Sequence, residues 1–163
     1  MNTVVTSKEE ILKTSRELIQ REGWSAVNIR SVAAACGVSV GSIYNYFDSK
    51  SALVGATVES VWCEIFHRPE DGAVFQDTQA CITWLYERME YGCKQYPGFF
   101  TLHSLGFMGE DKSDGRRKMQ QTWQHILDAL TIVLTRDKKI RPDLLRQDYD
   151  PTAVLEIVRR TLY

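Results

Sequence analysis

Apolar residues recur at intervals of three and four positions along most of the chain, which is the spacing of one face of an α-helix. The first such stripe contains Ile11 and Leu18 and lies between Ser7 and Gly23. Ser7 followed three residues later by Glu10 is a capping box, in which the two side chains bond the free amides at a helix N-terminus. The pattern predicts a first helix that begins after Ser7 and ends at Gly23.

Two short helices joined by a tight turn are predicted next. Asn28 and Ser39 each carry a side chain that can cap the first turn of a helix. Gly37 falls where a left-handed residue would end the helix before it, and the second helix is expected over 40–47. The residues expected to face inward on the two helices are Ile29, Val32, Ala33, Cys36, Ile43 and Phe47. Two short helices separated by a turn containing glycine form a helix-turn-helix, whose second helix enters the major groove of DNA.

The remaining pattern predicts longer helices and no strands. A helix that begins at Asp48 or Ser49 and is stopped by Pro69 would be about 27 Å long, enough to belong to two lobes. Further helices are expected over residues 78–95, 99–108, 116–136 and 151–163. We therefore predict an all-α protein with an N-terminal three-helix domain over residues 1–47. The long helix joins it to a helical domain over residues 48–163, whose last helix is expected to be truncated.

The helix-turn-helix and the residues after it read IRSVAAACGVSVGSIYNYFDSKSAL, from Ile29 to Leu53. This segment contains an apolar residue followed by Arg30, then Gly-Val-Ser, Gly-Ser-Ile-Tyr and Tyr-Phe, and finally Lys50 and Leu53. These residues at these spacings resemble the DNA-binding segment of the TetR/AcrR family of transcriptional regulators. With the first helix included, the resemblance covers about a third of the chain, and the remainder agrees only in length and helical character. The resemblance implies a DNA-binding domain followed by a helical ligand-binding and dimerisation domain.

Several side chains of the second short helix carry chemistry suited to DNA. Asn45 can form two hydrogen bonds with an adenine edge, and Val40 or the ring of Tyr44 can contact a thymine methyl group. Ser42 and the tyrosine hydroxyls suit phosphate oxygens. Gly41 would allow the helix to approach the DNA backbone closely. This helix is therefore interpreted as the recognition helix.

The resemblance adds two basic residues to the predicted DNA contacts. Lys50 matches the family's phosphate-contacting lysine, and Arg30 matches a position that reaches DNA from the flank of the recognition helix. The complete predicted set is Arg30, Ser39, Val40, Gly41, Ser42, Tyr44, Asn45, Tyr46 and Lys50. Two alternatives stay open: the tyrosines could simply pack against the protein, and Arg30 could form a salt bridge with a glutamate of the first helix.

The second half of the chain is rich in aromatic side chains, and a pocket lined by such residues is the usual form of a small-molecule site. The predicted ligand-binding residues are Trp62, Phe66, Trp84, Met89, Phe99, Phe100, His103 and Phe107. At helical spacing, any single one of these residues more often belongs to an ordinary apolar core.

The charge of the chain does not by itself indicate a nucleic-acid partner. The net charge is -1, and the six basic and six acidic side chains of residues 1–60 cancel. DNA affinity would therefore require positive groups gathered on one face, together with hydroxyl and helix N-terminal donors to phosphate.

Other chemistry is not indicated by the sequence. It shows no nucleophile beside a base, no phosphate-binding glycine loop and no pair of catalytic carboxylates, so an enzyme is not expected and neither is a cofactor or metal. Cys36, Cys63, Cys81 and Cys93 lack metal-binding spacing and are interpreted as buried thiols. Without a signal peptide or a membrane-spanning apolar run, we expect a cytoplasmic protein with no membrane partner.

The resemblance implies a repressor that a small-molecule effector releases from a palindromic operator in double-stranded DNA. One recognition helix reads only a few base pairs, so a homodimer on a palindrome is expected. The helices over 116–136 and 151–163 carry the best apolar seams for a four-helix dimer interface. Two alternatives stay open: a regulator of this fold that has no inducer and acts as an activator or through a protein partner, and a helical enzyme or binding module that merely contains the motif.

Overall fold

The computed structural model describes residues 6–66, 77–100, 124 and 126–139, and these residues are helical or form turns between helices. The elements are α1 (Lys8–Glu22), a 3-10 turn η1 (Trp24–Ala26), α2 (Ile29–Ala35), α3 (Val40–Tyr44), α4 (Lys50–Phe66), α5 (Thr78–Gln95) and a helix over 126–136. The predicted all-α class is confirmed. The predicted helix over 151–163, most of the helix over 99–108 and the first part of the helix over 116–136 lie outside the described residues.

The helix ends follow the short-range signals in the sequence. A side-chain oxygen accepts a main-chain N–H in the first turn of each of four helices, and these caps are Ser7, Asn28, Ser39 and Asp77. Gly23 and Gly37 adopt φ values of 84° and 67°, in the left-handed region that favours glycine. The bounds of α1 and α5 therefore agree with the predicted ones.

The recognition helix is shorter than predicted. It was expected over 40–47, but α3 ends at Tyr44, and the main-chain N–H groups of Tyr46 and Phe47 both bond the Ile43 oxygen at 3.0 Å. This shared acceptor ends the helix in a tight turn, as is common at helix C-termini. The long helix starts at Lys50, because the Ser49 hydroxyl accepts the N–H of Ala52 at 3.0 Å and so closes its first turn.

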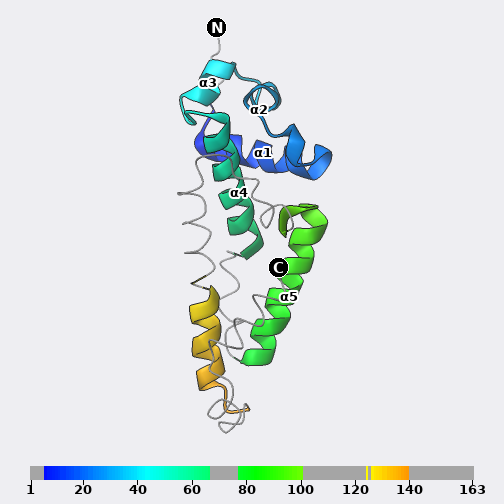
Figure 1. Ribbon diagram of the computed structural model, residues 1–163, viewed down its shortest axis with the longest axis vertical. Coiled ribbons are helices and arrows are strands. Elements are labelled where there is room, and N and C mark those ends of the chain that lie inside the picture. Colours follow the sequence, from blue (N-terminus) through cyan, green and yellow to red (C-terminus); the bar gives the residue numbers. More distant parts are fainter. Residues whose placement is uncertain (1–5, 67–76, 101–123, 125, 140–163) are drawn as a thin grey trace.

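One apolar core continues from the helix-turn-helix into the second lobe. Ile11, Val32 and Ile43 are fully buried where α1, α2 and α3 meet, and Val61 and Ile65 are fully buried further along α4. Figure 1 shows α1 lying across the upper part of α4, which runs down from α3 to lie beside α5. The long helix α4 therefore contacts both α1 and α5, and the division of the chain into two domains stays a prediction.

Close contacts hold α5 against the end of α4. Arg88 on α5 donates to the main-chain oxygen of Glu64 at 3.3 Å and also to that of Ile65, which are among the last carbonyls of α4 and have no partner within that helix. A Cβ atom at Gly92 would lie 2.8 Å from Cδ1 of Ile65 and 3.0 Å from the Phe100 ring. The absence of a side chain at Gly92 therefore permits this close packing.

The cysteines differ from the prediction of four buried thiols. Cys81 is buried and Cys36 is half-buried, but Cys63 and Cys93 are exposed on α4 and α5. The reason is that both helices bury only one side, and these two cysteines fall on the other. Burial raises the pKa of the Cys81 thiol to about 11, so this thiol is protonated and unreactive at neutral pH.

Within the described ranges, no helix combines the length and apolar character needed to cross a membrane.

Candidate nucleic-acid interface

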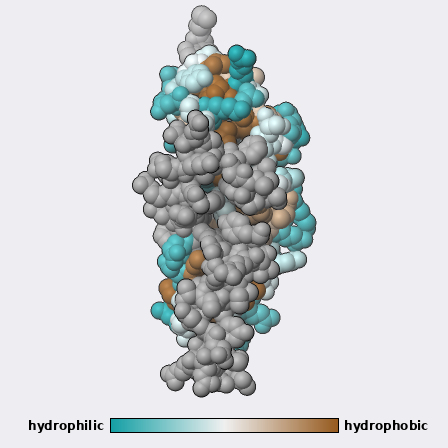
Figure 2. Space-filling view, in the orientation of Figure 1, coloured by the Kyte–Doolittle hydropathy of each residue, from teal (hydrophilic) through white to brown (hydrophobic). Residues whose placement is uncertain are grey.

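The recognition helix α3 presents large apolar and aromatic side chains to solvent. Val40, Tyr44 and Tyr46 are 40%, 49% and 41% exposed, whereas Ile43 and Phe47 on the opposite side are 0% and 4% exposed. Figure 2 shows hydrophilic and apolar patches side by side at the end of the molecule that α2 and α3 form. An exposed group of large apolar side chains rimmed by polar ones is typical of a binding surface.

Two main-chain hydrogen bonds define the turn before α3. The N–H of Val38 donates to the Ala33 oxygen at 3.0 Å, and the N–H of Gly37 donates to the Ala34 oxygen at 3.1 Å. These are the main-chain bonds of a helix that ends at a left-handed residue. The turn therefore fixes the direction in which α3 leaves α2.

Hydroxyl groups gather at the N-terminus of α3. The Ser39 hydroxyl accepts the Ser42 N–H at 3.1 Å, and the two hydroxyl oxygens lie 2.9 Å apart. Gly41 follows Ser39 by two residues, and a Cβ atom there would meet only the Ser39 hydroxyl, at 3.7 Å. The protein's own packing therefore does not require glycine at this position.

The two tyrosines of the recognition segment have different surroundings. The Tyr46 hydroxyl donates to the main-chain oxygen of Thr6 at 2.6 Å, which ties this segment to the residue before the α1 cap. In the part of the chain that the structure describes, the Tyr44 hydroxyl has no such bond. Asn45, between them, is exposed at the C-terminus of α3. The structure thus leaves Tyr44 and Asn45 available on this surface and uses the hydroxyl of Tyr46 internally.

The two predicted basic residues are both exposed. Lys50 is the first residue of α4, and Arg30 lies in the first turn of α2. The glutamates of α1 all fall within the described residues, and none of them forms a salt bridge with Arg30. The alternative role of Arg30 as an ion-pair partner of the first helix is therefore not observed.

Lys8 is a basic residue near this surface that the sequence analysis missed. Its ammonium group lies 5.7 Å from the centre of the Phe47 ring, within cation–π range. Lys8 and Phe47 are far apart in the sequence, so helix periodicity could not pair them. The contact places a positive charge of α1 beside the turn that follows α3.

The predicted ligand-binding residues within the described ranges pack against one another. The rings of Trp62 and Phe66 are stacked at 4.8 Å, and Trp62 meets Phe99 and Phe100 edge-on at 5.4 and 6.0 Å. Phe66 also meets Trp84 edge-on at 6.3 Å. Met89 is half-buried beside this aromatic cluster, while His103 and Phe107 lie outside the described residues. A ligand site at these residues stays a prediction.

None of the histidine, cysteine, aspartate and glutamate side chains among residues 6–66, 77–100, 124 and 126–139 gather in a group of three suited to a metal ion.

Comparison with known proteins identifies the helix-turn-helix unit. Residues 11–57 match the family model described as bacterial regulatory proteins of the tetR family. YerO of Bacillus subtilis, named an uncharacterized HTH-type transcriptional regulator, is 42% identical over 52 residues, which are 32% of this chain and 18% of YerO. UidR of Escherichia coli K12, named an HTH-type transcriptional regulator, is 27% identical over 74 residues, which are 44% of this chain and 38% of UidR. The matched segments thus span well under half the length of these relatives.

The fold is also similar to that of a solved protein. The crystal structure of an HlyIIR mutant protein aligns with a TM-score of 0.53 and 16% identity, covering 94% of this chain and 81% of that one. At this identity the likeness concerns the fold alone. The family model, the named relatives and the geometry of α1 to α4 agree that residues 11–57 form a helix-turn-helix domain of the type found in the tetR family of bacterial regulatory proteins.

Proposed function

We propose that the protein is a DNA-binding transcriptional regulator in which α3 enters the major groove of double-stranded DNA. The observation that carries this proposal is the exposure of Val40, Tyr44 and Asn45 on one short helix whose other side is fully buried. A monomer gains nothing from exposing these side chains to water, whereas a base edge or a thymine methyl group would cover them. No role in catalysis is proposed for these residues.

The N-terminus of α3 supports close contact with the DNA backbone. Gly41 has a helical backbone and space around it, so its lack of a side chain suits the approach of an external molecule rather than internal packing. The hydroxyls of Ser39 and Ser42 lie beside it and can donate to phosphate oxygens. We place these three residues at the DNA backbone.

Three exposed basic residues at the same end of the molecule can contact phosphates, although Glu9, Glu10 and Asp48 are exposed beside two of them. Arg30, Lys50 and Lys8 lie on three different helices around α3 and are exposed. Contacts of this kind position the protein on DNA and contribute most of its sequence-independent affinity. We therefore assign these residues to phosphates that flank the base-reading helix.

In this proposal, regulation requires a second subunit and a second conformation of the protein. The protein would bind a palindromic operator as a homodimer, because α3 alone reads too few base pairs for useful specificity. Acting in the cytoplasm as a repressor, it would be released when a small molecule binds better to a state whose recognition helices no longer match the two half-sites. The aromatic cluster around Trp62 and Phe66 is the proposed effector region.

A regulator without a small-molecule inducer is the second candidate. It is favoured because the rings of the aromatic cluster pack directly against one another. Ring faces that are covered by neighbouring rings are not open to a small molecule. A thermal-shift screen against metabolites and drugs separates the two candidates. A compound that stabilises the protein and weakens its DNA binding supports the inducible repressor, and a panel with no stabilising compound supports the second candidate.

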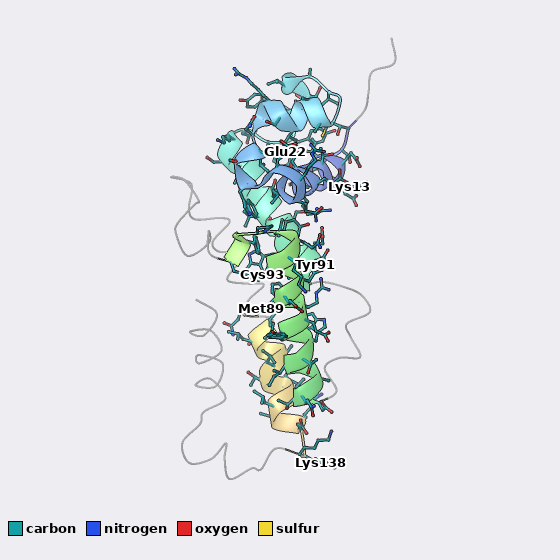
Figure 3. All side chains as sticks on the ribbon, turned by 90° about the vertical axis from the view of Figure 1, so that its right-hand side faces the viewer. Lys13, Glu22, Met89, Tyr91, Cys93 and Lys138 are labelled. Atoms are coloured by element: carbon teal, nitrogen blue, oxygen red, sulfur yellow. The ribbon has the colours of Figure 1, made fainter. Side chains whose placement is uncertain are left out.

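A mobility-shift experiment on the DNA upstream of the protein's own gene tests the proposal. Tyr44→Ala and Lys50→Ala should together abolish the shift, while circular dichroism shows a folded protein. Tyr86→Ala and Lys138→Ala are the matched controls, because Tyr86 is 70% exposed on α5 and Lys138 is exposed at the far end of the molecule (Figure 3). If the Tyr44 and Lys50 variants bind like the parent, the assigned surface is wrong.

A further inference from the structure

One face of α1 lies outside the helix-turn-helix core. Its side chains contact the second lobe. Arg16 and Gln20 are four residues apart on α1, and Trp24 follows after another four in η1. The four-residue spacing places Arg16 and Gln20 on one side of α1, and Trp24 lies beyond the end of that helix at Gly23. Each of the three side chains contacts a residue of α4, α5 or the segment directly after α5.

The central contact of this face is a hydrogen bond to a completely buried tyrosine. The Gln20 amide donates to the Tyr96 hydroxyl at 3.1 Å, and Tyr96, the C-cap residue of α5, is 0% exposed. Burial and a hydrogen bond to Glu64 both raise the pKa of Tyr96, so its hydroxyl stays neutral at physiological pH. The Tyr96 hydroxyl therefore bonds α1 through Gln20 and α4 through Glu64, so these two bonds together favour one position of α1 on the second lobe.

The other two contacts flank this hydrogen bond. Arg16 forms a salt bridge with Glu64 of α4 at 2.7 Å and also donates to the Ser60 hydroxyl. Trp24 stacks on Phe99 with ring centres 5.6 Å apart and planes inclined by only 15°. An ion pair, a hydrogen bond and a ring stack thus connect Arg16, Gln20 and Trp24 to residues that follow the helix-turn-helix in the chain.

We propose that Tyr96 is a positioning residue for DNA recognition: through Gln20 it fixes the orientation of the helix-turn-helix unit on the second lobe. The opposite face of α1 carries Ile11 and Leu18, which are buried in the same core as Ile43 of α3, so α1 and α3 turn together. Figure 1 shows the C-terminal end of α5 directly below the C-terminal end of α1. This inference rests on the proposed function, because orientation matters only if α3 reads DNA.

Orientation decides which DNA a dimer of such regulators accepts. Two recognition helices must meet half-sites about 34 Å apart or a multiple of this distance, and one inserted base pair moves and rotates one half-site. A rigidly held helix-turn-helix unit therefore discriminates strongly between spacings. A helix-turn-helix unit that has lost its hydrogen bond to Tyr96 would be oriented less strictly and would tolerate a changed half-site spacing better.

The experiment compares Tyr96→Phe with the parent on two duplexes. The first is the palindrome that the parent selects from a random library, and the second is the same palindrome with one base pair inserted between the half-sites. We expect the parent's preference for the first duplex to fall by about three- to tenfold in Tyr96→Phe, the typical value of one hydrogen bond. Gln20→Leu should give the same reduction, and the double variant should give no further reduction.

Thr57→Val is the matched control, because it also removes a buried hydroxyl. The Thr57 hydroxyl donates to the main-chain oxygen of Leu53 at 2.8 Å, within α4, and Thr57 is 0% exposed. The Thr57→Val preference between the two duplexes should equal that of the parent. The ratio of two affinities does not depend on the fraction of folded protein, so a merely destabilising substitution leaves it unchanged.

The remaining outcomes distinguish failure of the positioning role of Tyr96 from failure of the proposed function. If Tyr96→Phe weakens binding equally on both duplexes, or if Thr57→Val relaxes the preference as much, Tyr96 has only a structural role. If the parent selects no palindrome at all, the proposed function itself fails and the inference falls with it. A selected palindrome with an unchanged preference in Tyr96→Phe refutes the inference alone.

Discussion

The hydroxyl of Tyr46 donates a 2.6 Å hydrogen bond to the main-chain oxygen of Thr6, and this bond connects the recognition segment to the start of α1. The sequence alone predicts that this hydroxyl contacts a DNA phosphate. In the structure it already has a partner, whereas the hydroxyl of Tyr44 has none among the described residues. The two tyrosines are therefore expected to differ in function.

Removing the two hydroxyls in turn should separate stability from DNA binding. Tyr46→Phe loses an exposed internal hydrogen bond, so we expect a decrease of about 0.5–1 kcal/mol in the free energy of unfolding and little change in DNA affinity. Tyr44→Phe should leave stability unchanged and weaken DNA binding by about three- to tenfold. Urea denaturation and mobility-shift titration measure the two effects. A Tyr46→Phe variant with parental stability and weak DNA binding would reverse the assignment.

The salt dependence of DNA binding should report the phosphate contact of Lys50. Each lysine that neutralises a phosphate releases counterions, and a homodimer carries two copies of Lys50. In Lys50→Ala we therefore expect log affinity to fall less steeply with log salt concentration, with the magnitude of the negative slope smaller by about two. Lys138→Ala, which removes an exposed charge far from α3, should keep the parental slope. An unchanged slope in Lys50→Ala would place that lysine away from the phosphates.

The parts of the fold that the sequence predicted are those that depend on short-range interactions. The caps at Asn28 and Ser39 and the left-handed Gly37 each involve residues within a few positions of one another. Their residue types are suited to those positions whatever surrounds them. The helix-turn-helix could therefore be placed without any knowledge of the second lobe.

Contacts between distant residues could not be predicted in this way. Trp24 is half-buried and stacks on Phe99, which lies 75 residues further along the chain. Arg16 and Gln20 carry polar side chains, so the apolar stripe of α1 gave no sign that this face is covered. Periodicity shows which residues avoid water, but it does not show which partner a polar face will meet.

Acid should weaken the junction between α5 and the helix over 126–136. Asp137 accepts the N–H of Thr78 at 2.8 Å, and main-chain hydrogen bonds from Thr78 and Lys139 hold the pKa of its carboxyl below the ordinary value of 3.8. A carboxyl with a lowered folded-state pKa stabilises the protein above its unfolded-state pKa, and this contribution is lost as the pH falls through the folded-state value. We expect Asp137→Ala to melt below the parent at pH 7 and the difference to shrink below about pH 4. A melting-temperature difference that stays constant from pH 7 to pH 3 would contradict this role.

The two helical glycines of α4 and α5 should respond in opposite ways to alanine. At Gly92 a Cβ atom would lie 2.8 Å from Cδ1 of the fully buried Ile65 and 3.0 Å from the ring of Phe100, so the packing must shift. Such overpacking costs about 1–3 kcal/mol, which exceeds the gain of about 1 kcal/mol in helix propensity. At Gly55 a Cβ atom meets nothing within 4 Å, so only the gain remains. Urea denaturation should therefore show Gly92→Ala to be less stable than the parent and Gly55→Ala to be more stable, and a stabilised Gly92→Ala would mean that α4 and α5 are not packed as closely as described.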